Sequence, residues 1–258
     1  MTISVIIPTC DDDLRLQWAL EALCAQSVSP LEVIVVNDGG GKATSDLVRS
    51  FESRLPIAHL YASPSSPDFR AALARNEGAR YSMGELLVFM DCDCVLPPDG
   101  LKAHFGNQWR NWLGQQQPYR VGVGSRRYLL ESRVRSFEPP FDFSGLWNQA
   151  VEIADTPCPT DVVFRSFNLS VPAALFCELG GFDETFTGWG GEDSEFFWRM
   201  VRWGIEPGNR VVEIAPLPQA IHLNHPQRGA HQPRNTDADI AARINEPITA
   251  NGGPLVRF

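Results

Sequence analysis

Two aspartates directly follow a strongly apolar stretch of the chain. Residues 86–90, Leu-Leu-Val-Phe-Met, lead into Asp91 and Asp93, which are separated by one cysteine. An apolar run of this length predicts a strand that is buried on both faces. In an extended backbone the two carboxylates point the same way, roughly 7 Å apart at about 3.3 Å per residue. Crowded carboxylates repel each other unless a cation lies beside them.

Oxygen ligands suit hard divalent ions such as Mg²⁺ or Mn²⁺, which commonly also bind substrate phosphates. The aspartate pair therefore indicates metal-diphosphate binding. A solvated acidic turn that caps the next helix explains the same residues, and the tripeptide alone does not decide between the two.

A second acidic group lies in the sequence GWGGEDSE at residues 188–195, where a helix is predicted to begin. Stabilisation by the helix dipole is one explanation for acidic residues in a first turn. The functional explanation is that one carboxylate, of Glu192 or Asp193, accepts a proton from an incoming hydroxyl group. The other would hydrogen-bond an acceptor, and Trp189 would pack against its sugar ring.

Two histidines, His222 and His225, follow a short predicted strand. Imidazole is a common metal ligand, so either histidine could complete a site begun by Asp93. A lone histidine is more often structural, but two beside a carboxylate-rich site favour ligation.

The first hundred residues alternate between apolar, β-branched runs and amphipathic segments. Strands are predicted at residues 3–7, 32–36, 58–61 and 86–90. Helices are predicted after the aspartates at 11–13 and at residues 44–53 and 68–81. This alternation predicts a parallel sheet with helices on both sides. Ligands bind at the carboxyl ends of such strands, where the two aspartates fall.

Two further loops should lie at the same edge of the sheet. Thr9 follows the first predicted strand, and Asp38 follows the second beside three glycines. Asp38 can accept a hydrogen bond from a base or a ribose, or it belongs to an ordinary glycine-rich turn. Arg75, in the helix before the apolar strand, can contact phosphate or only solvate a helix face. Neither loop has a P-loop or dinucleotide-binding motif.

Beyond residue 98 the pattern becomes irregular. A helix is predicted at 99–111 and a strand at 121–125, whereas 132–160 is aromatic and proline-rich without a regular period. Such long segments are typical of lids or binding surfaces, and their aromatic side chains either stack on a sugar or fill the core. Ser170 is expected to cap a short helix with Pro172 in its first turn.

Composition limits the possible partners and compartments. The chain has 258 residues, 43% of them hydrophobic, and a formal net charge of −9, so a nucleic-acid partner is disfavoured. The six cysteines are scattered and are interpreted as reduced thiols. No signal-like segment and no run of ~20 apolar residues is present. A cytoplasmic location is predicted, with peripheral association at the inner face of the membrane left open.

Taken together, these motifs resemble the inverting family 2 glycosyltransferases of the GT-A fold. The resemblance is carried by VIIPT (5–9), VIVVNDGG (33–40), ARNEGA (74–79) and FMDCDC (89–94). The segment that ends in GWGGEDSEFFWRM at residue 200 is similar to the acceptor-side motif of β-1,4-galactosyltransferases and N-acetylgalactosaminyltransferases.

The resemblance implies an α/β fold of the GT-A type, with a Rossmann-like, mostly parallel central sheet flanked by helices. Residues 1–98 would form the nucleotide-sugar-binding half. Residues 99–225 would form the acceptor-binding and catalytic half of the same domain, followed by a polar, loosely held tail at 226–258.

The resemblance also implies roles for individual residues. Implied nucleotide-binding residues are Pro8, Thr9, Asp38, Arg75 and Asp91. Asp93 would bind Mn²⁺ or Mg²⁺, with His222 as the preferred further ligand and His225 as the alternative. Asp193 would be the catalytic base, and Trp189 and Glu192 would bind the acceptor.

The implied activity is metal-dependent, inverting transfer of a sugar from a UDP-sugar to a hydroxyl of a saccharide or glycoconjugate, as in polysaccharide biosynthesis. Galactose or N-acetylgalactosamine is suggested by the GWGGED motif. One alternative is a sugar nucleotidyltransferase, but those enzymes normally have a glycine-rich, basic N-terminal loop where residues 8–13 are acidic. The other is a catalytically inactive carbohydrate-binding module of the same fold, which the intact carboxylates disfavour.

Overall fold

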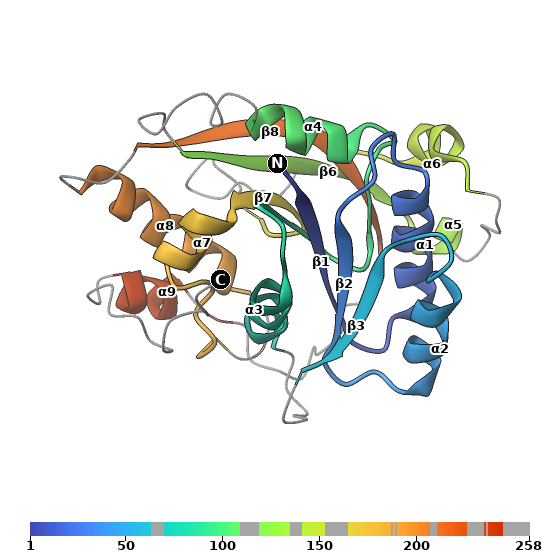
Figure 1. Ribbon diagram of the computed structural model, residues 1–258, viewed down its shortest axis with the longest axis horizontal. Helices are drawn as coiled ribbons and strands as arrows, with labels where there is room; N and C mark the ends of the chain where they lie inside the picture. Colours follow the sequence, from blue (N-terminus) through green and yellow to red (C-terminus); the bar gives the residue numbers. More distant parts are fainter. Residues whose placement is uncertain are drawn as a thin grey trace.

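The protein contains one mixed sheet with helices packed on it (Figure 1). The computed structural model describes residues 1–62, 70–108, 119–134, 141–152, 165–186, 188, 190–206, 211–225, 235 and 237–244. The described strands are β1 (Ile3–Thr9), β2 (Glu32–Asn37), β3 (Ile57–Tyr61), β4 (Leu86–Met90), β5 (Cys94–Val95), β6 (Tyr119–Leu129), β7 (Asn168–Pro172) and β8 (Val212–Leu223). Their order in the sheet is β3-β2-β1-β4-β7-β6-β8-β5.

The first four strands in this order confirm the predicted parallel α/β arrangement. β1 pairs in parallel with both β2 and β4, and β2 pairs in parallel with β3. The helices that connect these strands are α1 (Asp13–Cys24), α2 (Lys42–Ser50) and α3 (Ala71–Tyr81). β1, β2 and β4 are buried along their whole length, as expected for strands covered on both faces.

The other strands make the sheet mixed, and one of them, β8, pairs with the short strand that follows β4. β4 pairs antiparallel with β7, β7 antiparallel with β6, and β6 parallel with β8. The short strand β5 follows β4 almost at once and pairs antiparallel with β8, so that Cys94 lies opposite His222. The chain after Asp93 is therefore joined to the strand that carries the first histidine.

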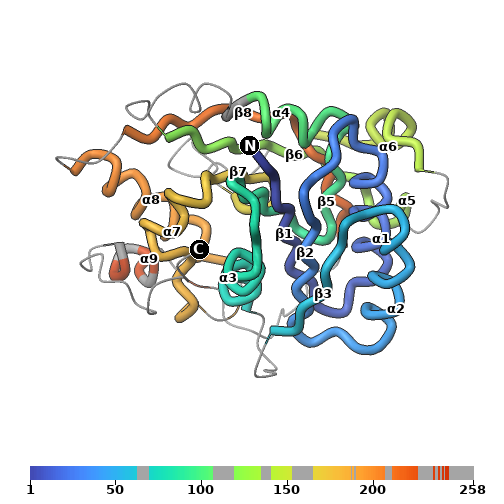
Figure 2. The backbone as a smooth tube through the Cα atoms, in the orientation of Figure 1, coloured from blue at the N-terminus to red at the C-terminus, as the bar shows by residue number. Residues whose placement is uncertain are grey.

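The described helices of the second half are α4 (Gly100–Gln108), α5 (Glu131–Val134), α6 (Phe143–Gln149), α7 (Ala173–Glu178), α8 (Glu192–Ile205) and α9 (Asp237–Ile244). In Figure 1, α1 and α2 lie on one side of the first strands, whereas α7, α8 and α9 gather on the other. The tube view shows α1 running beside the short strand β5 (Figure 2). No helix in the described ranges combines the length and apolarity needed to cross a bilayer.

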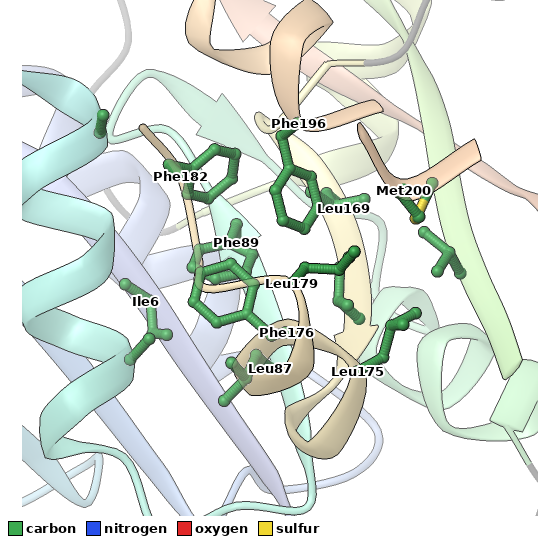
Figure 3. Packing of buried hydrophobic residues seen from close by; sticks show 14 of the residues in the cluster. Ile6, Leu87, Phe89, Leu169, Leu175, Phe176, Leu179, Phe182, Phe196 and Met200 are labelled. Carbon is green, nitrogen blue, oxygen red and sulfur yellow. The ribbon is translucent and has the colours of Figure 1, made fainter. Parts of the chain in front are cut away.

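Alternate side chains of the central strands enter two different cores, as the pleat requires. Leu87 and Phe89 of β4 join one core with α7 and α8. Leu86, Val88 and Met90 of the same strand join a second core against α1. Figure 3 shows the first core, in which the Phe176 ring lies between Phe89 (centroids 5.1 Å apart), Phe196 (5.5 Å) and Phe182 (5.6 Å).

Two expectations about the second half differ from the structure. Ser170 is not a helix cap: it lies inside β7, opposite Val88, and α7 begins only after Pro172. The irregular segment 132–160 contains part of α5 and all of α6, while residues 135–140 and 153–164 lie outside the described residues. Trp147 of α6 packs in a third apolar cluster and stacks on Phe143. Phe141, Phe143 and Trp147 of this segment are partly buried against that cluster.

The C-terminal tail also differs from its expected loose attachment where it is described. Helix α9 packs against α8, and Arg243 of α9 forms an ion pair with Asp183 at 2.8 Å. These residues hold the segment against the second half of the domain.

Replacing Phe176 by Ala should destabilise the fold strongly, because the buried ring would leave a cavity among three other phenylalanines. We expect the free energy of unfolding to fall by about 3–5 kcal/mol, measured by urea denaturation. Tyr81→Ala is the control, since the Tyr81 side chain is 53% exposed and its loss should change stability by no more than about 0.5 kcal/mol. Equal losses in the two variants would contradict this account of the core.

Candidate active site

The two aspartates lie in a tight turn after β4 and not in the extended backbone predicted from the sequence. The Cys94 amide donates to the Asp91 carbonyl at 3.0 Å, which closes the turn. The turn gives the two carboxylates different partners. Asp91 accepts from Arg75 at 2.8 Å, and Asp93 contacts His225 at 2.9 Å.

Asp93, His222 and His225 converge as a candidate metal centre. The Asp93 Oδ2 atom lies 3.3 Å from His222 Nε2 and 2.9 Å from His225 Nε2. One ligand atom from each residue lies within 4.8 Å of the others. Both histidines are therefore placed with Asp93, whereas the sequence left the choice between them open.

The chemistry of this cluster fits a divalent cation. Asp93 is only 8% exposed, and burial opposes its ionisation, but His222 and His225 outweigh that effect and hold its pKa well below the usual range. The buried Nδ1 atom of His222 has no hydrogen-bond partner among the described residues. An ionised carboxylate and two imidazoles are the oxygen and nitrogen donors that transition-metal ions such as Mn²⁺ accept.

Arg75 connects the aspartate turn to the start of α8. Arg75 belongs to α3, which packs against β1 and β2, and the residue is only 3% exposed. Nη2 donates to Asp91 at 2.8 Å and Nη1 donates to Glu192 at 2.9 Å, while Asp193 lies 3.8 Å from Nη1. Burial alone would lower the pKa of Arg75, but these three carboxylates raise it above its ordinary value. The guanidinium thus stays charged between the two acidic groups.

Glycines allow α8 to begin at Glu192. Gly190 and Gly191 have φ values of 75° and 102°, a backbone conformation that other residues rarely adopt. A Cβ atom on Gly191 would lie 2.8 Å from the Phe186 ring and 2.9 Å from Cβ of Asn235.

Trp189, which was expected to bind the acceptor, lies outside the described residues.

Asp193 and Glu192 differ in their surroundings. Asp193 Oδ1 accepts a hydrogen bond from the buried Ser166 hydroxyl at 2.6 Å. Glu192 is 8% exposed; burial first, and then the charge of Asp193, raise its pKa to about 7 against the opposing effect of Arg75. Near neutral pH the Glu192 carboxyl group is therefore about half protonated.

The loops after β1 and β2 meet at the same edge of the sheet. Pro8 and Thr9 lie opposite Val36 and Asn37, and the Asp38 amide donates to the Thr9 carbonyl at 2.8 Å. Asp38 is buried and accepts from the Arg70 amide at 3.1 Å, and it also forms an ion pair with the Arg70 guanidinium. The structure brings these predicted nucleotide-binding residues together.

Two residues of the site were missed in the sequence. Arg70 directly follows residues 63–69, which lie outside the described residues, and Ser166 lies in an irregular stretch before β7. Arg70 contacts Asp38, which lies 32 residues away along the chain, and Ser166 contacts Asp193, which lies 27 residues away. Neither has a spacing or motif that indicates its partner.

The raised pKa of Glu192 predicts a pH-dependent stability. The unfolded chain releases this proton near pH 4.5 and the folded protein near pH 7, so stability is lost as the pH rises through that interval. Relative to Glu192→Gln, the wild-type free energy of unfolding should fall by on the order of 3 kcal/mol across it. Urea unfolding of both proteins from below pH 4.5 to above pH 7 measures the difference, because the other groups titrate in both. A difference that stays constant with pH would contradict the shift.

Two family models match successive parts of the chain. The model for glycosyl transferase family 2 matches residues 4–166, and the model described as the N-terminal domain of galactosyltransferase matches residues 164–226. The first contains the aspartate turn and Arg75, and the second contains the start of α8 and both histidines.

Among curated proteins, validoxylamine A glucosyltransferase from Streptomyces hygroscopicus subsp. limoneus is 34% identical over 230 residues, which cover 79% of this chain and 48% of that protein. Chondroitin synthase from Escherichia coli is 26% identical over 271 residues, which cover 94% of this chain and 38% of that protein. The chain spans about half or less of the length of these relatives.

Solved structures are similar in fold. S. aureus TarS 1-349 in complex with UDP-GlcNAc superposes with a TM-score of 0.62 at 16% identity, covering 94% of this chain and 64% of that one. The mannosyltransferase PcManGT from Pyrobaculum calidifontis, in complex with GDP-Man and Mn²⁺, gives a TM-score of 0.60 at 20% identity, covering 89% and 58%. These likenesses confirm the GT-A type of α/β fold. The glycosyl transferase family 2 model matches more than half of this chain, so the chain belongs to glycosyltransferase family 2.

Proposed function

We propose that this chain transfers a sugar from a UDP-sugar to a hydroxyl of a saccharide or glycoconjugate acceptor, with inversion at the anomeric carbon and with a bound Mn²⁺ ion. The observation that carries the proposal is Arg75, which links Asp91 of the aspartate turn to Glu192 and Asp193 at the start of α8. A donor bound at the turn would thus face two carboxylates across a single guanidinium.

In this proposal the donor lies along the edge formed by the loops after β1, β2 and β4. Pro8, Thr9 and Asp38 would contact the nucleoside, with Arg75 and Asp91 close to the ribose and phosphates. Asp38 is already oriented by Arg70, so we include Arg70 in the nucleotide site. A nucleotide-sugar donor is supported by the two solved structures of similar fold, which are complexes with UDP-GlcNAc and GDP-Man.

Asp93, His222 and His225 would hold the metal ion. Two imidazoles in the donor set favour Mn²⁺ over Mg²⁺, which prefers oxygen ligands alone. When bound, such an ion supplies Lewis-acid stabilisation of the negative charge on the departing diphosphate.

Asp193 would act as the base for the attacking hydroxyl. Its contacts with Ser166 and Arg75 both involve Oδ1, so we assign proton acceptance to Oδ2. Attack on the side of the anomeric carbon opposite the diphosphate would be a single displacement, which converts an α-linked donor into a β-glycoside. Glu192, whose pKa is raised to about 7, would hydrogen-bond the acceptor beside Trp189.

The donor sugar has three candidates. The GWGGED motif and the galactosyltransferase-domain match support galactose or N-acetylgalactosamine. The similarity to a protein named validoxylamine A glucosyltransferase supports glucose instead.

The rival functions, sugar nucleotidyltransferase and inactive binding module, have no such support. The cytoplasmic location and any attachment to the membrane stay predictions, as do the boundaries 1–98, 99–225 and 226–258.

Asp193→Asn should reduce turnover by roughly 10²–10⁴-fold, the usual contribution of a general base, because the amide cannot take the proton. Binding of UDP should stay unchanged, since Asp193 faces the acceptor. Initial rates with a saturating UDP-sugar, together with UDP titrations by calorimetry, measure the two effects. Asp183→Asn is the matched control, because it also removes one carboxylate that pairs with an arginine, Arg243. Near-normal turnover in Asp193→Asn would refute the assignment.

Asp93→Ala should abolish the Mn²⁺-dependent part of UDP binding, because the centre loses its only carboxylate ligand among the described residues. When wild type with Mn²⁺ is tested against a panel of UDP- and GDP-sugars, the true donor should raise the melting temperature. At a donor concentration of a hundred times Kd, the added stability is about 2.7 kcal/mol. The variant should show no such rise when Mn²⁺ is added. Unchanged affinity for Mn²⁺ and UDP in the variant would rule out this metal site.

A further inference from the structure

Arg15 of α1 is a buried arginine whose guanidinium binds backbone carbonyls of a distant segment. The residue is 7% exposed. Its Nε atom donates to the Leu223 carbonyl at 3.0 Å, and Nη2 donates to the Asn224 carbonyl at 2.9 Å. Nη1 donates to the Asp12 carboxylate at 3.1 Å. A buried guanidinium is tolerated only with such partners, so its position is well determined.

The two carbonyls belong to the residues between His222 and His225. Arg15 therefore holds the backbone that joins the two histidines of the candidate metal centre. From other directions, the Leu223 amide donates to the Asp93 carbonyl at 2.8 Å, and the Asn224 amide donates to the Leu129 carbonyl at 2.9 Å. The segment is thus fixed by side-chain and backbone contacts together.

Two residues at the start of α1 depart from local helix preferences. Asp12 occupies the N-cap position but makes no side-chain capping hydrogen bond, because its carboxylate pairs with Arg15. Arg15 itself places a positive charge in the first turn, where the helix dipole disfavours it. Departures of this kind from local preference are typical of residues that serve a functional site.

We propose that Arg15 is a positioning residue for the metal centre. The rigid, forked guanidinium donates to two successive carbonyls in a fixed geometry that a flexible lysine ammonium does not reproduce, and so keeps both imidazoles directed at Asp93 before the ion binds. The inference rests on the proposed function, since it assigns a role toward the same metal ion. Arg15 also connects the loop after β1, through Asp12, to the segment that carries the two histidines.

Arg15→Lys tests the proposal, and Arg199→Lys is a closely matched control. Arg199 is also largely buried, pairs with a carboxylate of its own helix, Glu195, and donates to two backbone carbonyls, those of Leu179 and Gly181. Its two carbonyls belong to the turn after α7, which carries no residue of the candidate metal centre. Both variants should lower the melting temperature. Binding of Mn²⁺ alone, measured by electron paramagnetic resonance of the free ion, should weaken about 10–100-fold only in Arg15→Lys.

The outcomes separate this inference from the proposed function. If wild type binds Mn²⁺, Asp93→Ala does not, and Arg15→Lys binds as tightly as Arg199→Lys, then Arg15 has only a structural role and the inference fails alone. If wild type itself binds no Mn²⁺, both the metal centre and this inference are wrong.

A milder variant covers the case in which Arg15→Lys does not fold. Asp12→Asn keeps the guanidinium but removes its counter-charge, and it should weaken Mn²⁺ binding by a smaller factor than that expected for Arg15→Lys. Wild-type affinity in a folded Asp12→Asn protein would overturn the proposal.

Discussion

The ion pairs of Arg75 constrain the whole site. Arg75 is only 3% exposed, and its guanidinium needs carboxylates nearby, because an unpaired buried charge is very costly. Its partners come from two distant segments, the turn after β4 and the first turn of α8. The fold can bury Arg75 only if those segments meet, so the contact that neutralises the charge also assembles the two acidic groups.

The mixed sheet provides the second constraint. Had β4 been followed by another parallel strand, the aspartate turn and the histidines would have stayed apart. Instead β5 turns back to pair with β8, which sets Cys94 opposite His222 and Asp93 beside both histidines. The metal-type cluster thus depends on a two-residue strand whose only long-range partner among the described strands is β8.

Local patterns were sufficient to predict the parallel half of the sheet and to indicate which residues to consider for a site. The buried runs of β1, β2 and β4 are continuous and apolar, and Asp93, Asp193 and Arg75 lie in recognisable motifs. The β7 strand was mistaken for a helix cap, because Ser170 and Pro172 favour a helix start locally, whereas pairing with β4 and β6 decides their conformation. The turn at Asp91, and the contacts of Ser166, Arg70 and Arg15, depend on segments distant in sequence and leave no periodic signal.

A crystal structure with Mn²⁺ and UDP would test the account most directly, using the anomalous scattering of manganese to locate the ion. We expect an anomalous peak in contact with Asp93, His222 and His225, with the diphosphate of UDP beside it. The terminal phosphate, to which the donor sugar would be attached, should face Asp193. A peak elsewhere, or a nucleotide on the opposite side of the sheet from the start of α8, would contradict the central claim that one guanidinium-linked pocket holds donor and base together.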